Sequence, residues 1–297
     1  MLNRVNYFNL GASLYVPCTR PDLLDIANGT KLIARSFIFC LEDAVREDEL
    51  ALALDNLAET LDNCQSTSNS LRFIRVRNLA IMDTVMRMPG IHKFDGFVLP
   101  KATRHNILDY AEIATSSDTH VIMPTLETAE VFDLAEMTNL RDLVLKQNWH
   151  HRVLAWRIGG NDLMSLLGVR RSRVRTLYES PLMPTLAGLS TTFKAYGFNL
   201  TAPVFEIFDN RELLVHEVAR DIEFGFLGKT AVHPDQIPHI EAQYKVTSDE
   251  VAAAYQIVAE DAPAVFRLNG AMCEPATHRV WALGIITRAE TYGIWAP

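Results

Sequence analysis

Charged and amide side chains stand at or just after the ends of the short apolar runs of this chain. Parallel strands of an α/β protein end at such positions, and the catalytic residues of such folds gather there. The side chains concerned are Arg20, Glu42, Asp43, Arg75, Lys101, Glu127, Asn161, Asp162, Glu206 and His233. Brought to one rim, these acids and cations would form a polar pocket that holds anions and has room for a divalent cation.

Glu127 and Asp162 are the strongest candidates for a metal pair. They follow the fifth and sixth apolar runs, so we expect their strands to be neighbours. Two hard carboxylates that leave other positions to water and substrate match the way Mg²⁺ is held in proteins. Glu127 also precedes the start of a helix, so a helix-capping or surface role is the alternative, and the spacing alone does not decide between them.

Three basic side chains each allow a catalytic and a structural role. Arg75 could clamp a carboxylate through two parallel hydrogen bonds and stabilise an enolate, or form an ion pair with Glu42 or Asp43. Lys101 could form a Schiff base, although a lysine at such a position more often pairs with neighbouring acids. His233 could act as a base, but a histidine before a proline is as often structural.

The one basic run holds Arg170, Arg171, Arg173 and Arg175. A solvated helix face paired with acids such as Glu179 is the favoured interpretation. The alternatives are a site for the phosphate-rich tail of a cofactor or for an RNA segment. No aromatic residues are interleaved with these arginines, so the run does not support RNA binding.

Short β-rich runs alternate with amphipathic helical stretches through most of the chain. The expected strands are Ser13–Val16, Ser36–Leu41, Arg72–Arg77, Gly96–Leu99, His120–Pro124, Val153–Ile158, Ala202–Ile207 and Gly225–Val232. Eight strand–helix units favour a closed (β/α)8 TIM barrel. An open doubly wound sheet would carry a glycine-rich phosphate-binding motif after its first strand, and the sequence has none.

Two stretches depart from the simple strand–helix repeat. Residues 163–200 are too long for one barrel helix and are expected to form two helices with a break at Pro181 and Pro184. Residues 245–297 follow the barrel domain of residues 1–244 as a helical segment. In it we expect a helix over Ser248–Glu260 capped by Ser248, a turn at Asn269-Gly270 and a final helix over Ala276–Tyr292. This segment is expected to act as a lid or an oligomer contact.

Composition excludes several classes of protein. The 297 residues are 48% hydrophobic and 22% charged, which suits a folded domain with a large core. The formal net charge of −8 argues against nucleic acid or an anionic membrane surface as a general partner. No apolar run is long enough to cross a bilayer, and the four cysteines form no CxxC pair, so a cytoplasmic location with reduced thiols is expected.

Taken in order, the polar motifs resemble those of the citrate lyase β-subunit-like family, within the wider HpcH/HpaI aldolase superfamily. The motifs that carry the resemblance are Ser13-Leu14-Tyr15-Val16-Pro17, Thr19-Arg20-Pro21, Leu41-Glu42-Asp43-Ala44-Val45, Arg75-Val76, Gly96-Phe97-Val98-Leu99-Pro100-Lys101, Leu126-Glu127-Thr128-Ala129, Gly160-Asn161-Asp162-Leu163 and Gly225-Phe226-Leu227-Gly228-Lys229-Thr230-Ala231-Val232-His233-Pro234. Residues Asn269–Pro275 resemble an altered form of the family's C-terminal lid motif. The resemblance spans nearly the whole chain.

The resemblance implies a homo-oligomer, a trimer or a multiple of it, built from (β/α)8 barrels. It implies Mg²⁺ held by Glu127 and Asp162. The reaction would cleave or form a carbon–carbon bond of a 2-oxo or 3-hydroxy acid, or of its CoA thioester, through a metal-stabilised enolate. The catalytic residues would be Arg75, Glu42, Asp43 and Glu274, and the substrate or CoA would contact Arg20, Arg75, Lys101 and Gly160.

Three positions depart from the family's usual pattern. Cys40 replaces an aspartate, Asn161 replaces a glutamate, and in the lid Glu274 stands in the acid position with Pro275 one residue closer than usual. With these departures, the chain resembles a divergent branch of carbon–carbon lyase-like proteins found beside stress-response genes. They leave two alternatives to a CoA-using lyase: an aldolase that acts on free oxo acids, and a barrel without turnover that binds a metabolite.

Overall fold

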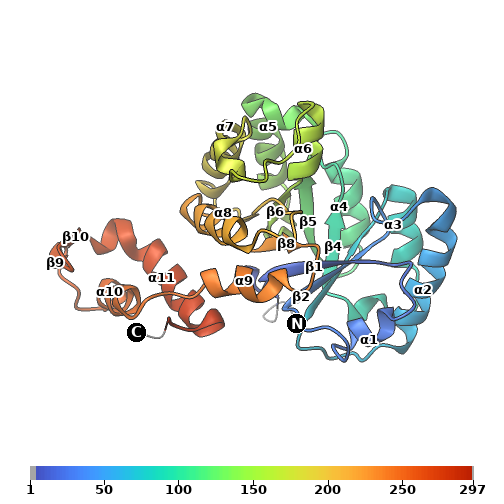
Figure 1. The fold of residues 1–297 in the computed structure, drawn as a ribbon, viewed down its shortest axis with the longest axis horizontal. Coiled ribbons are helices and arrows are strands. Elements are labelled where there is room, and N and C mark those ends of the chain that lie inside the picture. Colours follow the sequence, from blue (N-terminus) through green and yellow to red (C-terminus); the bar gives the residue numbers. More distant parts are fainter. Residues whose placement is uncertain (1–4, 296–297) are drawn as a thin grey trace. The chain divides into compact units, whose positions relative to one another are not determined.

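The computed structural model describes residues 5–295, and eight parallel strands form its central sheet (Figure 1). The sheet order is β7-β6-β5-β4-β3-β2-β1-β8. The strands are β1 (Ala12–Pro17), β2 (Ser36–Cys40), β3 (Leu71–Arg75), β4 (Gly96–Leu99), β5 (Val121–Leu126), β6 (Trp156–Ile158), β7 (Leu200–Thr201) and β8 (Lys229–Ala231). A parallel bridge between Ala202 and Lys229 joins the two ends of the sheet. The predicted (β/α)8 barrel is therefore confirmed.

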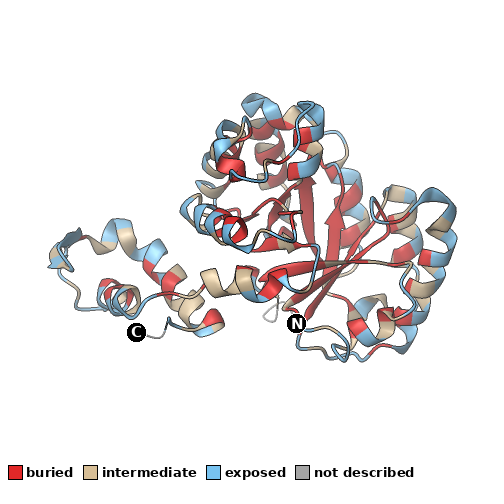
Figure 2. Ribbon diagram, viewed as in Figure 1, coloured by how far each residue is buried: buried red, intermediate tan, exposed pale blue. Residues whose placement is uncertain are grey.

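Helices follow the strands and cover the outside of the barrel. They are α1 (Leu23–Ala27), α2 (Leu50–Asn63), α3 (Leu79–Met86), α4 (Ile107–Thr115), α5 (Leu134–Leu145), α6 (Gly160–Leu166), α7 (Met183–Leu189), α8 (Arg211–Glu223) and α9 (Gln236–Gln243). A π-helical turn, Ser190–Lys194, continues α7. Most strand residues are buried, whereas each helix is buried only along one face (Figure 2). This pattern is typical of a sheet covered on both sides.

Several of the expected strands end earlier or begin later than their sequences suggested. The expected strand Ala202–Ile207 was wrong, because pairing stops at Ala202 and Pro203 has no N–H group to continue it. In Gly225–Val232 only Lys229–Ala231 is strand, since Gly225 and Gly228 adopt positive φ angles of 78° and 86°. The third strand ends at Arg75 rather than Arg77.

The chain divides into two compact units, Met1–Ile240 and Glu241–Pro297. The second contains α10 (Ser248–Val258), a hairpin of β9 (Phe266–Leu268) and β10 (Ala271–Cys273), and α11 (Pro275–Tyr292). The two helices and the hairpin bury a small apolar core that includes Ala254, Ile257, Cys273, Ala282 and Ile285. The expected turn at Asn269-Gly270 is confirmed, and both of its residues have positive φ angles, 50° and 80°.

Thr247, rather than the expected Ser248, caps helix α10. Its hydroxyl accepts a hydrogen bond from the Glu250 amide at 3.2 Å, and the Glu250 carboxylate accepts one from the Thr247 amide at 2.7 Å. This reciprocal pair satisfies two amides that the first turn would leave free. Across residues 5–295, no helix is both long enough and apolar enough to cross a membrane.

Candidate active site

A pocket of about 430 Å³ opens among residues at the carboxyl ends of the barrel strands. Strand β1 contributes Tyr15, β3 contributes Arg75 and β6 contributes Arg157. Glu127 follows β5 directly, and Asp162 lies in the first turn of α6. The remaining lining residues are Cys40, Asp43, Ala44, Thr125, Ile158, Gly159, Gly160, Asn161, Ser165, Val204, Thr230 and Val232. The barrel therefore brings both expected metal ligands and the expected arginine into one cavity.

Arg75 is surrounded by three carboxylates. Its Nη2 atom lies 2.6 Å from Glu42 Oε2, 3.1 Å from Glu127 Oε1 and 3.4 Å from Asp43 Oδ2. Its Nε atom is buried without a hydrogen-bond acceptor, and Nη1 has none among the residues described. The ion pair, one of the two roles that the sequence left open, is therefore formed through Nη2, and Nη1 alone is left to bind a substrate oxygen.

Glu127 is a buried carboxylate held in place by the backbone. The Lys101 amide, at a residue with a positive φ of 48°, donates to Glu127 Oε1 at 2.8 Å. Burial raises the pKa of Glu127 to about 7, Arg75 opposes this shift, and the negative charge of Asp162 adds to it. A cation placed between Glu127 and Asp162 would stabilise the ionised form of the Glu127 carboxylate.

The donor set fits a magnesium ion. Burial, and next the charge of Asp43, raise the pKa of Asp162, so the acids of the pocket repel one another. Mg²⁺ prefers oxygen ligands and is often held by only one or two carboxylates, with water and substrate completing the octahedron. No group of three or more His, Cys, Asp or Glu side chains within residues 5–295 forms a cluster able to hold a metal. The pair Glu127 and Asp162 is thus suited to an open site rather than a closed structural one.

We expect Mg²⁺ affinity to depend on pH through Glu127. A metal ligand must be ionised, and the pKa of Glu127 is about 7, so protonation competes with the metal at lower pH. Affinity should fall by about tenfold for each pH unit below about 7 and level off above it. Calorimetric titration of Mg²⁺ at a series of pH values measures this directly. An affinity that stays constant down to about pH 5 would exclude Glu127 as a ligand.

Gly159 leaves the space that Glu127 occupies. A Cβ atom at position 159 would lie 2.4 Å from Glu127 Cβ and 2.5 Å from Glu127 Oε2. Gly159→Ala must therefore displace the carboxylate, and we expect Mg²⁺ affinity to fall by about 10- to 100-fold. Gly284→Ala is the matched control, because a Cβ there meets no atom within 4 Å. Equal Mg²⁺ affinities for both variants would contradict the assignment of Glu127.

Lys101 is placed as a charge partner rather than as a Schiff-base nucleophile. Its Nζ atom lies 3.2 Å from Glu42 Oε1. Burial lowers the pKa of Lys101, but the hydrogen bond to Glu42 and the surrounding acids outweigh this effect, so the pKa is raised overall. A lysine that forms a Schiff base needs the opposite shift.

Three of the expected site residues, Arg20, His233 and Glu274, do not line this pocket. Arg20 binds Asp22 through two hydrogen bonds of 2.8 and 2.7 Å, and neither residue lines the pocket. His233 is half exposed and lies 3.6 Å from Asp235. Glu274 belongs to the C-terminal unit, where its carboxylate accepts a hydrogen bond from the Thr277 hydroxyl at 3.2 Å. Gly160 and Asn161, by contrast, line the pocket.

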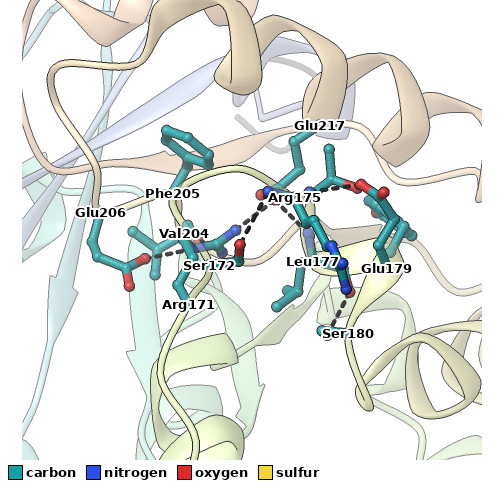
Figure 3. A network of polar contacts seen from close by, with 12 residues as sticks. Arg171, Ser172, Arg175, Leu177, Glu179, Ser180, Val204, Phe205, Glu206 and Glu217 are labelled. Atoms are coloured by element: carbon teal, nitrogen blue, oxygen red, sulfur yellow. Dashed lines mark hydrogen bonds and ion pairs between the residues drawn. The ribbon is translucent and has the colours of Figure 1, made fainter.

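The basic run lies in a loop rather than on the expected helix, and Arg170, Arg173 and Arg175 are exposed as predicted, whereas Arg171 is not. Arg171 is buried in a loop, where it donates to Glu206 at 2.6 Å, to Glu217 at 2.5 Å and to the Val204 carbonyl at 2.5 Å (Figure 3). Glu217 also pairs with the buried Lys229 at 3.0 Å. This network fixes Glu206 and Val204 after β7, so Glu206 serves the fold rather than the pocket.

Arg157 and Tyr15 are among the lining residues that were not predicted from the sequence. Arg157 is the only charged residue in the apolar run Val153–Ile158, and that interruption was the signal that could have identified it. The centre of the Tyr15 ring lies 5.9 Å from Arg75 Cζ and 5.6 Å from Arg157 Cζ. The pocket therefore contains two guanidinium groups on one aromatic ring.

Comparisons with known proteins agree with this fold. The chain is 28% identical over 254 residues to a (3S)-malyl-CoA thioesterase of Cereibacter sphaeroides. The aligned region covers 83% of this chain and 81% of that protein. A citrate lyase of Burkholderia xenovorans superposes with a TM-score of 0.73 at 17% identity, over 97% of this chain and 94% of that one. CitE of Mycobacterium tuberculosis, solved with magnesium, acetoacetate and coenzyme A, superposes with a TM-score of 0.68 at 20% identity, over 95% and 99%. These two structures show that the fold is shared.

The family described as C-C_Bond_Lyase of the TIM-Barrel fold matches residues 4–294. The chain belongs to this family and is an enzyme of the carbon–carbon lyase class. The predicted carbon–carbon lyase branch is thereby confirmed.

Proposed function

We propose that this enzyme is a Mg²⁺-dependent lyase that cleaves or forms a carbon–carbon bond of a 2-oxo or 3-hydroxy acid, or of its CoA thioester, through an enolate. The observation that carries the proposal is the pair of Glu127 and Asp162 in one pocket with Arg75. Two acids that repel one another invite a divalent cation, and Arg75 keeps donors free for a substrate oxygen. Magnesium bound there would polarise the substrate carbonyl and stabilise the enolate.

The chain's own residues would orient and stabilise the substrate. Arg75 Nη1 would donate to the carboxylate or oxo group beside the metal, and the positive charge of the guanidinium would stabilise the developing enolate. Glu42 holds the guanidinium at 2.6 Å, and the Lys101 amide holds Glu127 at 2.8 Å, so both are fixed before the substrate arrives. Such preorganisation lowers the barrier without reorganisation during the reaction. Asp43, half of whose side chain is open to solvent, is the acid best placed to exchange a proton.

The choice between a CoA thioester and a free acid divides the proposal into two candidates. The relatives named (3S)-malyl-CoA thioesterase support a thioester substrate. The ion pair of Arg20 with Asp22 supports the second candidate, an aldolase acting on free oxo acids. Arg20 was expected to hold the phosphate-bearing part of CoA, but it is paired with Asp22, whose pKa is lowered chiefly by the hydrogen bond from Arg20.

The proposal also includes the oligomeric state of the enzyme and a role for Glu274. We propose a cytoplasmic homo-oligomer, a trimer or a multiple of it, in which Glu274 of the C-terminal unit acts as an acid–base group. The hydrogen bond from Thr277 leaves one oxygen of the Glu274 carboxylate without a partner among the described residues. Sedimentation analysis would measure the oligomeric state.

Calorimetric titration of oxalate, a mimic of enolpyruvate, tests the proposal. We expect tight binding in the presence of Mg²⁺ and little binding without it. That result would justify a screen of oxo acids and acyl-CoA thioesters for turnover. Absence of oxalate binding in both conditions would overturn the lyase proposal and favour a barrel that binds a metabolite without turnover, with Cys40 and the altered lid as the first positions to revert.

A further inference from the structure

Arg157 carries a buried positive charge that no carboxylate within ion-pair distance balances among residues 5–295. It is only 2% exposed and lies on β6 at the pocket wall. Its Nη2 atom donates to Thr230 Oγ1 at 2.6 Å, and its Nη1 atom lies 4.0 Å from the Met123 sulfur. A guanidinium carries five N–H groups. Three of those of Arg157 therefore have no acceptor in residues 5–295, and no carboxylate there lies within ion-pair distance.

The other buried arginines of the described chain are compensated by carboxylate or carbonyl oxygen atoms; they are Arg72, Arg75, Arg141, Arg152 and Arg171. A hydroxyl and a thioether carry no negative charge. The Tyr15 face, 5.6 Å from Arg157 Cζ, adds a weak attraction but no hydrogen-bond acceptor. Arg157 is thus the one buried guanidinium in residues 5–295 without an oxygen anion or carbonyl.

A buried charge without a partner destabilises a fold, and arginine cannot escape by losing its proton. The position of Arg157 on the pocket wall allows an anion in the pocket to supply the partner. Arg75 does not need that anion in the same way, because Glu42, Glu127 and Asp43 already surround it. A group of a bound ligand at β6 could therefore supply the acceptor that Arg157 lacks.

We propose that Arg157 binds a second carboxylate of the substrate, so that the enzyme acts on a dicarboxylic acid rather than a monocarboxylic one. This inference rests on the proposed function, in which the oxo-acid end of the substrate lies at Arg75, Glu127 and Asp162. Both guanidinium groups lie within 6 Å of the centre of the Tyr15 ring, so one small molecule can reach both. A single guanidinium matches the single charge and the two oxygens of a carboxylate. A phosphate dianion would leave one charge without a partner.

Matched pairs of oxo acids test this assignment by calorimetry in the presence of Mg²⁺. Oxaloacetate and 2-oxobutyrate differ in the second carboxylate, as do 2-oxoglutarate and 2-oxopentanoate, which are one carbon longer. We expect the parent enzyme to bind at least one diacid about tenfold or more tightly than its monoacid counterpart. Arg157→Met should abolish this preference and leave oxalate affinity within about twofold. No preference in the parent, or a preference that survives in Arg157→Met, would overturn the inference.

The experiment separates this inference from the proposed function. Oxalate has no distal carboxylate, so failure of Mg²⁺-dependent oxalate binding would count against the lyase site alone. A diacid preference that depends on Arg157 but not on Mg²⁺ would still support the inference. Displacement of the diacid by inorganic phosphate at lower concentration than by succinate would overturn the carboxylate assignment.

Thermal unfolding without ligand gives a second, independent readout. Arg157→Met removes an uncompensated charge and keeps a long apolar side chain, so we expect an unchanged or higher Tm. Arg152→Met is the matched control, because Arg152 is buried and donates to the carbonyls of His120 and Ser117. The control should have a clearly lower Tm. A comparable decrease for Arg157→Met, or failure of that variant to fold, would show that its charge is already compensated and would overturn the inference.

Discussion

Asp162→Asn will abolish Mg²⁺ binding and leave the barrel folded. The substitution removes one of two charged oxygen ligands and changes the side-chain volume little. Loss of that charge should weaken Mg²⁺ binding by at least about 100-fold, or about 3 kcal/mol. Calorimetric titration of Mg²⁺ measures the affinity, and circular dichroism checks the fold. A variant that binds Mg²⁺ as tightly as the parent would show that the metal site is elsewhere.

The same variant has a second consequence that needs no metal. The charge of Asp162 is one cause of the raised pKa of Glu127, so its removal should lower that pKa from about 7. Carbon NMR of labelled glutamate side chains would follow this titration. Asp109→Asn is a matched control, because Asp109 also lies in the first turn of a helix, α4, but is exposed. The control should change neither Mg²⁺ affinity nor the titration of Glu127.

Arg75→Lys will weaken the binding of oxalate in the presence of Mg²⁺ by about 10- to 100-fold. An ammonium keeps the positive charge and can still pair with Glu42, 2.6 Å from the arginine in the parent. It lacks the planar guanidinium that holds Nη2 against the acids and leaves Nη1 for a substrate oxygen, so it cannot make both contacts in the same geometry. Oxalate affinity should therefore fall while Mg²⁺ affinity and folding change little.

Arg77→Lys is the control for this result. Arg77 is two residues further along the chain, but its guanidinium donates to the carbonyls of Leu41 and Val45 at 3.1 and 2.5 Å and does not line the pocket. Its replacement should affect stability but not oxalate binding. Unchanged oxalate affinity in Arg75→Lys, or an equal loss in both variants, would exclude Arg75 as the substrate clamp.

The sequence by itself determined the class of fold. Eight apolar runs with helical stretches between them predicted a closed (β/α)8 barrel, because a strand buried on both faces must be apolar throughout. Its motifs also indicated the family. The same alternation predicted that Glu127 and Asp162 would come close together, since the carboxyl ends of parallel strands meet at one rim of a barrel. The extent of β7 was not predictable from apolar character, because Pro203 and the contacts of Arg171 end the pairing.

Only the tertiary structure decided which charges are compensated. Arg20, Arg75, Arg157 and Arg171 have the same chemistry in the sequence, yet each has different partners in the fold. Arg20 pairs with a near neighbour along the chain, whereas the acids that compensate Arg171 come from positions more than thirty residues away. The pKa of Glu127 likewise depends on burial and on Asp162, which no local pattern encodes. Charges interact through space, so their partners follow from the folded arrangement of the strands rather than from residue type and spacing.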